Sequence, residues 1–288
     1  MPIFSRPVES VARTRLFARV VGGERGAPPR QHLVCSTQFS APEDLALILP
    51  LPTPPEAGED AVRFVDLSGY PGFFDDFGRG FGEEPASQAT QDRAPPNGSE
   101  PLAVQDVGAY EASFVPRRAD FSRLDPRFRL PEAAARALPC PANYGFAVFR
   151  RKAGQRQQVH PLALSFPTRN FQQIFFPTAQ FYGGEWLRRV SFDHILYFQG
   201  SEAMRLPLGF DVGTHRLGRL VGGVLGVGGG VKPPEASRDF ARAFVDLDAA
   251  QGLVDGDLKV LRFVLRATLP NRDVVLWPRY HERAGDYP

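Results

Sequence analysis

Two imidazoles and one carboxylate are the side chains of this sequence best suited to acid–base chemistry: His160, Asp193 and His194. His160 begins the segment HPLALSF, whereas Asp193 and His194 are adjacent within WLRRVSFDHILYFQG. A carboxylate beside an imidazole fixes the tautomer of the ring and raises its pKa towards neutrality, which suits proton transfer. If the two segments form neighbouring strands, these residues could be the catalytic cluster of a hydrolase-like or metal-assisted enzyme.

The same three residues have a structural interpretation, which we favour. A polar side chain at the end of a strand commonly hydrogen-bonds a buried backbone group. Consecutive residues of a regular strand also point to opposite faces of the sheet, which separates the side chains of Asp193 and His194. Catalysis by this cluster is therefore the less favoured alternative.

No other motif supplies a catalytic or cofactor-binding site. The glycine-rich segment at 222–232 lacks the Gly-Lys-Ser/Thr of a phosphate-binding loop, because Val231 precedes Lys232 and Pro233 follows it. This segment could instead be a lid over a small molecule, which is a further hypothesis for the function. The five histidines and two cysteines lack metal-binding spacing, and there is no G-x-S-x-G elbow. We therefore expect no metal and no cofactor.

The charge balance argues against nucleic acid and membranes as partners. The 288 residues include 34 Lys and Arg against 32 Asp and Glu, a formal net charge of +2, which creates no field that attracts a polyanion. No apolar segment approaches the roughly 18–20 residues that span a bilayer. The first residues lack the apolar stretch of a secretory signal. With two cysteines, the chain fits a reducing cytoplasm.

Alternation of apolar and polar residues, interrupted by Pro and Gly, predicts that strands position the candidate residues. The segments 15–21 and 32–39 are typical of a hairpin. The segment LALILPL at 45–51 is so continuously apolar that it should be buried on both faces. The segments 143–151 and 159–166 are expected to pair with one another.

The C-terminal part contains a second expected hairpin. Its strands are 258–268 and 274–277, and the intervening LPNRD has the composition of a turn. LYFQG at 196–200 resembles a protease cleavage sequence of expression linkers. The residues on both sides of it are also largely apolar, and no Gly/Ser linker flanks it. We therefore interpret it as a native buried strand.

Helical spacing occurs in a few short segments. One short helix with an aromatic face is predicted from four residues of PGFFDDFGRGF, namely Phe73, Phe74, Phe77 and Phe81. Further helices are expected at 235–251 and after Pro131. Residues 83–101 have no apolar periodicity, so we expect a flexible surface excursion there.

Two parts of the chain align at a constant offset, which suggests a duplicated half-domain. Phe39 aligns with Phe166, and the pseudo-repeat covers 33–82 and 160–205. Together with the strand pattern, this predicts a single domain over residues 1–288. Its fold class would be mainly β or α+β, with sandwich-like antiparallel sheets and a few short helices.

Three segments together resemble a bacterial protein family of unknown function: LALILPLPTPPEAGEDAVRFVDLSGYPGFFDDF, YGFAVFRRK and VHPLALSFPT with its following IFFPT. The shared pattern is a strand ending in LPxP, a later strand that begins with glycine and an aromatic residue, and an HPL strand ending in FP. This resemblance covers residues 33–199. It implies a bacterial origin and assigns no activity or catalytic residue.

The leading hypothesis is a cytoplasmic bacterial protein that acts through protein–protein contacts, either with a protein partner or by self-assembly. It rests on a sequence rich in core-forming segments, with no converging set of catalytic residues. The alternatives are an enzyme that uses His160, Asp193 and His194, and a small-molecule binder with the glycine-rich segment as its lid.

Overall fold

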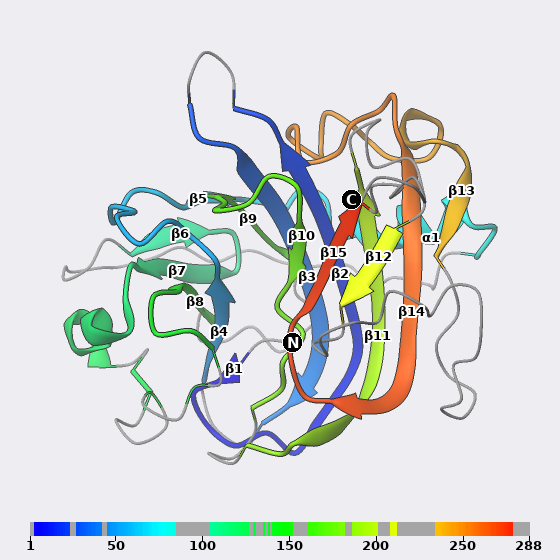
Figure 1. Ribbon diagram of the computed structural model, residues 1–288. Helices are drawn as coiled ribbons and strands as arrows, with labels where there is room; N and C mark the ends of the chain where they lie inside the picture. The colour runs from blue at the N-terminus through cyan, green and yellow to red at the C-terminus, as the bar shows by residue number, and fades with distance from the viewer. Residues whose placement is uncertain are drawn as a thin grey trace, which may run out of the picture.

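Three β-sheets form most of the described chain (Figure 1). The computed structural model describes residues 3–23, 27–41, 45–84, 104–126, 129–130, 135, 138, 140–151, 160–181, 186–200, 208–211 and 234–278. The predicted fold class, β-rich with antiparallel sheets and few short helices, is confirmed.

The largest sheet has seven strands in the order β13-β14-β11-β2-β3-β9-β5. In that order, the strands are β13 (Glu235–Phe240), β14 (Lys259–Pro270), β11 (Arg189–Gln199), β2 (Ser10–Val21), β3 (Arg30–Ser40), β9 (Leu162–Pro167) and β5 (Arg63–Val65). Neighbours are antiparallel except β2 and β11, which are parallel. The predicted hairpin of the first two long strands is therefore confirmed as β2 and β3.

The LYFQG segment lies at the end of β11, in the middle of this sheet. Leu196 is paired with Phe263 of β14 on one side and with Leu16 of β2 on the other. Both Leu196 and Phe198 are fully buried. The prediction that this segment is a buried strand is confirmed.

The second sheet has five strands in the order β1-β4-β8-β7-β6, and the third has three in the order β10-β15-β12. Their bounds are β1 (Ile3–Phe4), β4 (Ala46–Leu51), β8 (Gly145–Arg151), β7 (Tyr110–Val115), β6 (Gln105–Val107), β10 (Ile174–Phe176), β15 (Val274–Pro278) and β12 (Leu208–Asp211). Every residue of β4 is buried, as predicted. Its Leu47 and Leu49 belong to one hydrophobic cluster and Ile48 to another, so both of its faces are covered.

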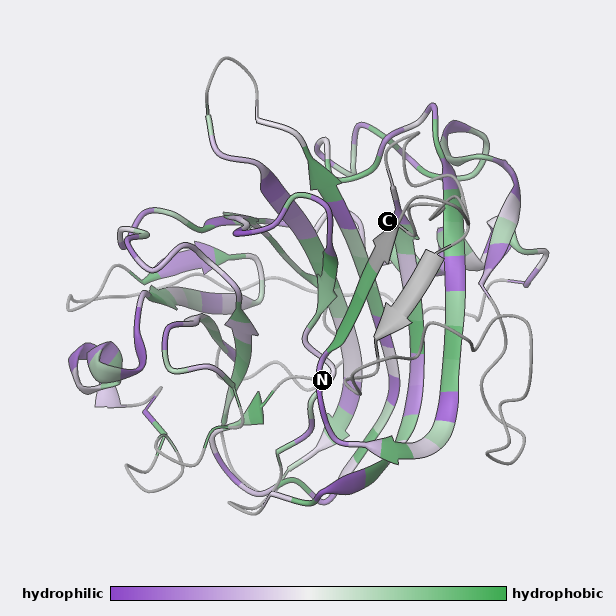
Figure 2. Ribbon diagram, in the orientation of Figure 1, coloured by the Kyte–Doolittle hydropathy of each residue, from purple (hydrophilic) through white to green (hydrophobic). Residues whose placement is uncertain are grey.

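The largest hydrophobic cluster joins the three sheets. It contains Leu16 and Leu196 from the seven-stranded sheet, Leu49 from the five-stranded sheet, and Ile174 and Leu276 from the three-stranded sheet. Figure 2 shows the alternation that produces such a one-sided core: β14 carries hydrophobic and hydrophilic bands in turn.

A second cluster covers the opposite face of the seven-stranded sheet, beneath α1 (Phe73–Gly80). The ring centroid of Phe77 lies 5.1 Å from Phe17 and 5.2 Å from Tyr197. These edge-on aromatic contacts dock the helix onto β2 and β11. The predicted short aromatic helix is therefore confirmed.

The prediction of a helix at 235–251 is wrong. Residues 235–240 form the edge strand β13, followed by the short 3-10 helix η4 (Ala241–Ala243) and turns. The Ser237 hydroxyl accepts a hydrogen bond from the backbone of Val260, and the backbone N–H of Ala241 donates to Leu258. Pairing with β14 therefore satisfies backbone groups that a helix would have bonded internally.

Two expected strand pairings are also wrong. β8 lies between β4 and β7, whereas β9 lies between β3 and β5 in another sheet. Likewise, β14 and β15 belong to different sheets. At the turn between them, Asn271 donates to the carbonyl oxygen of Gln180 and Asp273 accepts from the N–H of Ala179. These contacts take the chain from one sheet to the next instead of closing a hairpin.

Several predictions lie wholly or largely outside the described residues. They concern most of the 83–101 excursion, most of the helix after Pro131 and the glycine-rich segment at 222–232. The duplication stays a prediction. The same offset aligns Asp66, which follows β5, with Asp193, which lies inside β11. Among the described residues, no helix is long and apolar enough to cross a membrane.

Candidate functional site

His160 is a buried residue that Pro161 separates from the start of β9, and both of its ring nitrogens are bonded to the backbone. Its Nε2 accepts a hydrogen bond from the N–H of Ala109 at 3.0 Å, and its Nδ1 lies 2.9 Å from the carbonyl oxygen of Pro161. Burial lowers the pKa of the ring. The pattern assigns the proton to Nδ1 and leaves His160 neutral, which fits a structural role.

Asp193 and His194 point to opposite faces of β11. Asp193 is exposed and accepts a hydrogen bond from Nε of Arg266 at 2.9 Å. His194 is 1% exposed and lies beside Phe192, with ring centroids 5.1 Å apart. The alternation of a regular strand therefore separates the two side chains.

The structure does not bring His160 and His194 together. β2 and β3 lie between β9 and β11 in the sheet, which places the two histidines three strand spacings apart, about 14 Å. Hydrogen-bonded acid–base partners must lie within direct reach of one another. The structure therefore does not bring His160 within hydrogen-bonding reach of Asp193 and His194, and catalysis by these residues stays a prediction.

The cysteines are poorly suited to nucleophilic chemistry. Cys35 is buried, and burial raises its pKa to about 12. Burial also raises the pKa of Cys140. Because the thiolate is the reactive form, the raised pKa values make both thiols weaker nucleophiles. Within the described part of the chain, no three His, Cys, Asp or Glu side chains gather as metal ligands.

A groove lies on the surface between α1 and the β13–η4 segment. Its volume is about 770 Å³. The lining residues are Tyr70, Asp76, Arg79, Gly80, Arg238, Asp239, Arg242, Ala243, Phe244, Val245 and Asp246. We call it the α1–β13 groove.

A hydrogen-bond network centred on Tyr70 joins the two walls of the α1–β13 groove. The Tyr70 hydroxyl donates to Asp76 at 2.6 Å and accepts from the backbone N–H of Asp246 at 3.0 Å. Arg79 pairs with Asp76 at 2.6 Å. Burial raises the pKa of Tyr70, so the hydroxyl keeps its proton. The carboxylate of Asp76 is therefore already bonded to two side chains of the protein itself.

Gly80 allows the two walls to approach closely. A Cβ atom on this residue would lie 2.6 Å from the ring of Phe244. Real side chains do not tolerate such a contact, so only glycine lets Phe244 pack directly on the helix. This packing fixes the width of the groove.

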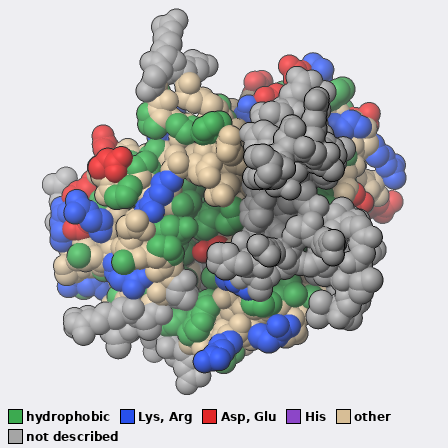
Figure 3. Space-filling view, in the orientation of Figure 1, with side chains coloured by type: hydrophobic (Ala, Val, Ile, Leu, Met, Phe, Trp, Pro, Cys, Tyr) green, Lys and Arg blue, Asp and Glu red, His purple; other side chains and the backbone are tan. Residues whose placement is uncertain are grey.

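Three arginines, Arg79, Arg238 and Arg242, and three aspartates, Asp76, Asp239 and Asp246, line the α1–β13 groove. Arg238 is exposed, and among the described residues no carboxylate forms an ion pair with its guanidinium. Arg242 lies over the ring of Phe240 at 5.6 Å and pairs with Asp257 at 2.6 Å, with both side chains largely exposed. At the edge of the molecule where β13 lies in Figure 1, Figure 3 shows basic and acidic side chains next to one another.

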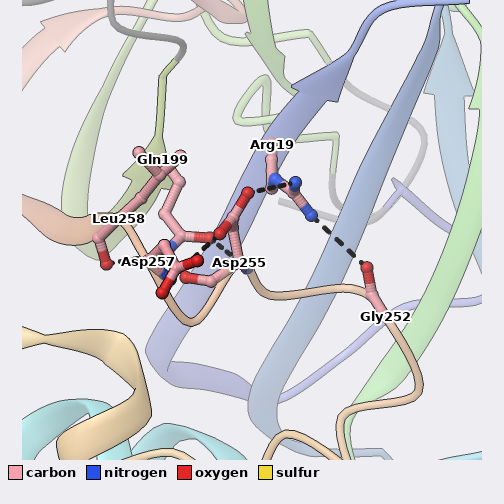
Figure 4. Close-up of polar contacts among 6 residues, drawn as sticks. All are labelled: Arg19, Gln199, Gly252, Asp255, Asp257 and Leu258. Carbon is pink, nitrogen blue, oxygen red and sulfur yellow. Dashed lines mark hydrogen bonds and ion pairs between the residues drawn. The ribbon is translucent and has the colours of Figure 1, made fainter.

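The loop behind η4 is anchored to the centre of the seven-stranded sheet (Figure 4). The buried amide of Gln199 accepts from the N–H of Asp255 at 2.8 Å and donates to its carbonyl oxygen at 2.8 Å. Arg19 donates to the Asp255 carboxylate at 2.7 Å and contacts the carbonyl oxygen of Gly252 at 3.4 Å. The wall formed by η4 is therefore attached to β2 and β11.

Sequence reasoning missed this groove because it assigned a helix to the segment that forms one wall. A signal against that helix was present in the turn-rich sequence DLDAAQGLVDGDL at 246–258, since Asp and Gly favour turns. Gly252 has a φ of +78°, a left-handed conformation that glycine adopts readily.

Comparison with known proteins identifies no family. The sequence matches no protein-family model and no curated protein. Similar solved structures include the crystal structure of baculovirus P35, with a TM-score of 0.46 and 11% identity over 95% of this chain and 98% of that chain. The crystal structure of the caspase-8/P35 complex matches with a TM-score of 0.44 and 10% identity over 93% of this chain and 96% of that chain. Similarity this weak assigns neither a partner nor an activity to this chain.

Proposed function

We propose that this protein acts by binding a protein partner, and that the partner presents an acidic segment to Arg238 and Arg242 in the α1–β13 groove. The observation that carries the proposal is the exposed guanidinium of Arg238 in the groove wall, which forms no ion pair among the described residues. Arg79 and Tyr70 engage Asp76, and Asp246 accepts from the N–H of Ala249 at 3.0 Å. Arg238 has no such internal partner among the described residues.

The chemistry of the groove favours carboxylates as its ligands. A guanidinium donates two parallel hydrogen bonds to a carboxylate, and arginine and aromatic residues are enriched where proteins meet. Phe240 is 45% exposed and lies against Arg242 at the rim. An acidic peptide segment could therefore bind the arginines and bury this ring.

The wall contacts support binding by a preorganised surface. The Tyr70 network and the Gln199 anchor hold both sides of the groove before a partner arrives. A surface ordered in advance loses less conformational entropy on association. The enzymatic alternative has weaker support, because its three candidate residues do not meet.

Co-purification with matched charge reversals tests the proposal. The tagged full-length chain is recovered from a bacterial cytoplasmic extract, the setting expected from the sequence, and stoichiometric partners are identified and then titrated. We expect Arg238→Glu and Arg242→Glu each to weaken the complex by about tenfold or more, because a like charge would face the acidic segment.

Arg266→Glu is the matched control. Arg266 forms an exposed ion pair with Asp193, as Arg242 does with Asp257, and the exposed fractions of the two arginines are 63% and 60%. This control should bind like the wild type. Equal binding by all three variants would exclude the groove, and the absence of any stoichiometric partner would contradict a contact function.

A further inference from the structure

A row of polar side chains crosses four neighbouring strands of the seven-stranded sheet, on the face that α1 also covers. Arg19 of β2 is paired with His32 of β3. Ser165 of β9 is paired with His32 on one side and with Arg63 of β5 on the other. Directly paired residues share a face of the sheet, and Arg30 joins them because it precedes His32 by two positions on β3. We call the four basic side chains, Arg19, Arg30, His32 and Arg63, the basic row.

The side chain of Arg30 extends from β3 across β9 towards β5. Its Nε donates to the hydroxyl oxygen of Ser165 at 2.9 Å, and its Nη2 donates to the carbonyl oxygens of Ser165 at 2.6 Å and Ala61 at 2.9 Å. Because Ser165 is the residue paired with Arg63, these bonds hold the Arg30 guanidinium on the side of β9 where Arg63 lies. They use three of its five N–H groups. Within the described chain, the two N–H groups of Nη1 have no partner and are available to a ligand.

The charge of the basic row is only partly balanced. Arg19 donates to the carboxylate of Asp255 at 2.7 Å (Figure 4). Among the described residues, no carboxylate forms an ion pair with Arg30 or Arg63. His32 is neutral near pH 7, because burial and the neighbouring charges of the three arginines lower its pKa to about 4. The row therefore carries two uncompensated positive charges, those of Arg30 and Arg63.

This arrangement of Arg30 and Arg63 is unfavourable without a bound anion. Like charges on one face of a sheet destabilise it. Burial lowers the pKa of Arg30, and the charge of Arg63 acts in the same direction. An anion between the two guanidiniums would turn this repulsion into attraction. Local conflicts of this kind are expected at functional sites.

We propose that Arg30 and Arg63 bind the phosphate group of a small phosphate monoester. Such a group carries a charge of about −1.5 to −2 at neutral pH, which matches two guanidiniums, whereas a carboxylate carries a single charge. Guanidinium groups donate paired hydrogen bonds to phosphate oxygens. The exposed side chain of Arg63 and Nη1 of Arg30 can both reach one such group. The site is separate from the α1–β13 groove, whose lining includes no residue of the basic row.

Imidazole NMR tests this proposal on the full chain. Histidine is labelled with ¹⁵N, and the protein is titrated just above neutral pH with methyl phosphate, methyl sulfate and acetate at constant ionic strength. Methyl sulfate has the tetrahedral shape of methyl phosphate but only one negative charge. We expect methyl phosphate to shift the signals of His32 saturably and to leave those of the buried His194 unchanged. It should bind at least about tenfold more tightly than either monoanion, because charge-assisted hydrogen bonds strengthen with the charge of the acceptor.

The pH dependence of binding provides a second measurement. Methyl phosphate takes up its second proton near pH 6 and then carries one charge. Its affinity should therefore fall as the pH decreases through this range. His32, with a pKa of about 4, stays neutral there and does not offset the loss. An affinity that stayed constant through this range would contradict recognition of the dianion.

Matched arginine variants locate the site. Arg63→Gln should weaken the binding of methyl phosphate by at least about tenfold, because it removes one of the two guanidiniums. Arg117→Gln is the control and should bind like the wild type. Arg117 follows β7 of the five-stranded sheet, is exposed like Arg63, and forms no ion pair with any described residue. The absence of a saturable shift, equal affinities for the three anions, or unchanged binding by Arg63→Gln would overturn the proposal.

Discussion

Arg19 and Asp255 lie 236 positions apart in the chain and form an ion pair of 2.7 Å that joins the centre of the seven-stranded sheet to the loop behind the α1–β13 groove. Gln199, which is paired with Arg19 in the ladder of β2 and β11, forms hydrogen bonds with the backbone of the same loop. A wall of the groove is thus held by two neighbouring strands, although the loop itself has no regular structure.

Gln199→Leu should loosen this wall. Gln199 is fully buried and bonds the N–H and carbonyl oxygen of Asp255, so leucine would leave both backbone groups without partners. We expect the free energy of unfolding to fall by about 2–3 kcal/mol. Urea denaturation measures the loss, and hydrogen exchange should show faster opening of residues 250–257. Arg266→Gln, at an exposed ion pair, should change the free energy by less than about 0.5 kcal/mol; similar losses in both variants would contradict the anchoring role.

The elements that could be predicted from the sequence are those whose burial follows a local pattern. β4 is apolar throughout because both of its faces and both of its edges are covered. The aromatic spacing of α1 reflects one face packed on Phe17 and Tyr197. In each case, the pattern of apolar residues within one segment is enough to predict the element.

The elements that could not be predicted depend on distant partners. The phenylalanines at 240 and 244 have helical spacing, but pairing of β13 with β14 and the Ser237 contact with Val260 favour an edge strand. Whether the candidate catalytic residues lie together likewise depends on the order of the strands in the sheet. His160 and His194 are separated by β2 and β3, which the sequences around the two histidines do not reveal.

Two buried histidines should respond oppositely to the same substitution. His160 bonds two backbone groups, whereas His194 bonds none among the described residues. His160→Leu should lower the free energy of unfolding by about 2–3 kcal/mol, and His194→Leu should raise it by about 1–2 kcal/mol, because one change creates unsatisfied groups and the other removes them. Parallel guanidinium chloride titrations measure both values, and a loss of similar size in the two variants would show that His194 has a structural partner.

Asp273 should make the fold less stable as the pH rises. Burial raises its pKa from 3.8 to about 6, so the folded state holds this proton more tightly than the unfolded chain. The resulting penalty is absent below the unfolded value, grows between about pH 4 and 6, and reaches the order of 3 kcal/mol above that range. Asp273→Asn keeps an oxygen that can accept from Ala179. We expect it to match the wild type at pH 4 and to be more stable at pH 7, as measured by urea denaturation at each pH; a constant difference across the range would contradict the assignment.

His32 should produce the opposite slope over an overlapping pH range. Burial is the main cause that lowers its pKa from 6.5 to about 4, and the neighbouring charges of Arg19, Arg30 and Arg63 act in the same direction. The unfolded chain therefore binds this proton first, and stability that is complete above pH 6.5 is lost as the pH falls towards 4, by on the order of 3 kcal/mol.

His32→Gln should flatten the acid side of the stability curve, whereas Asp273→Asn should steepen it because the compensating carboxyl is gone. The same urea series measures both variants, and the double variant should lie between them, since the sites titrate independently on different strands. A His32→Gln curve parallel to that of the wild type would show that another group controls the acid transition.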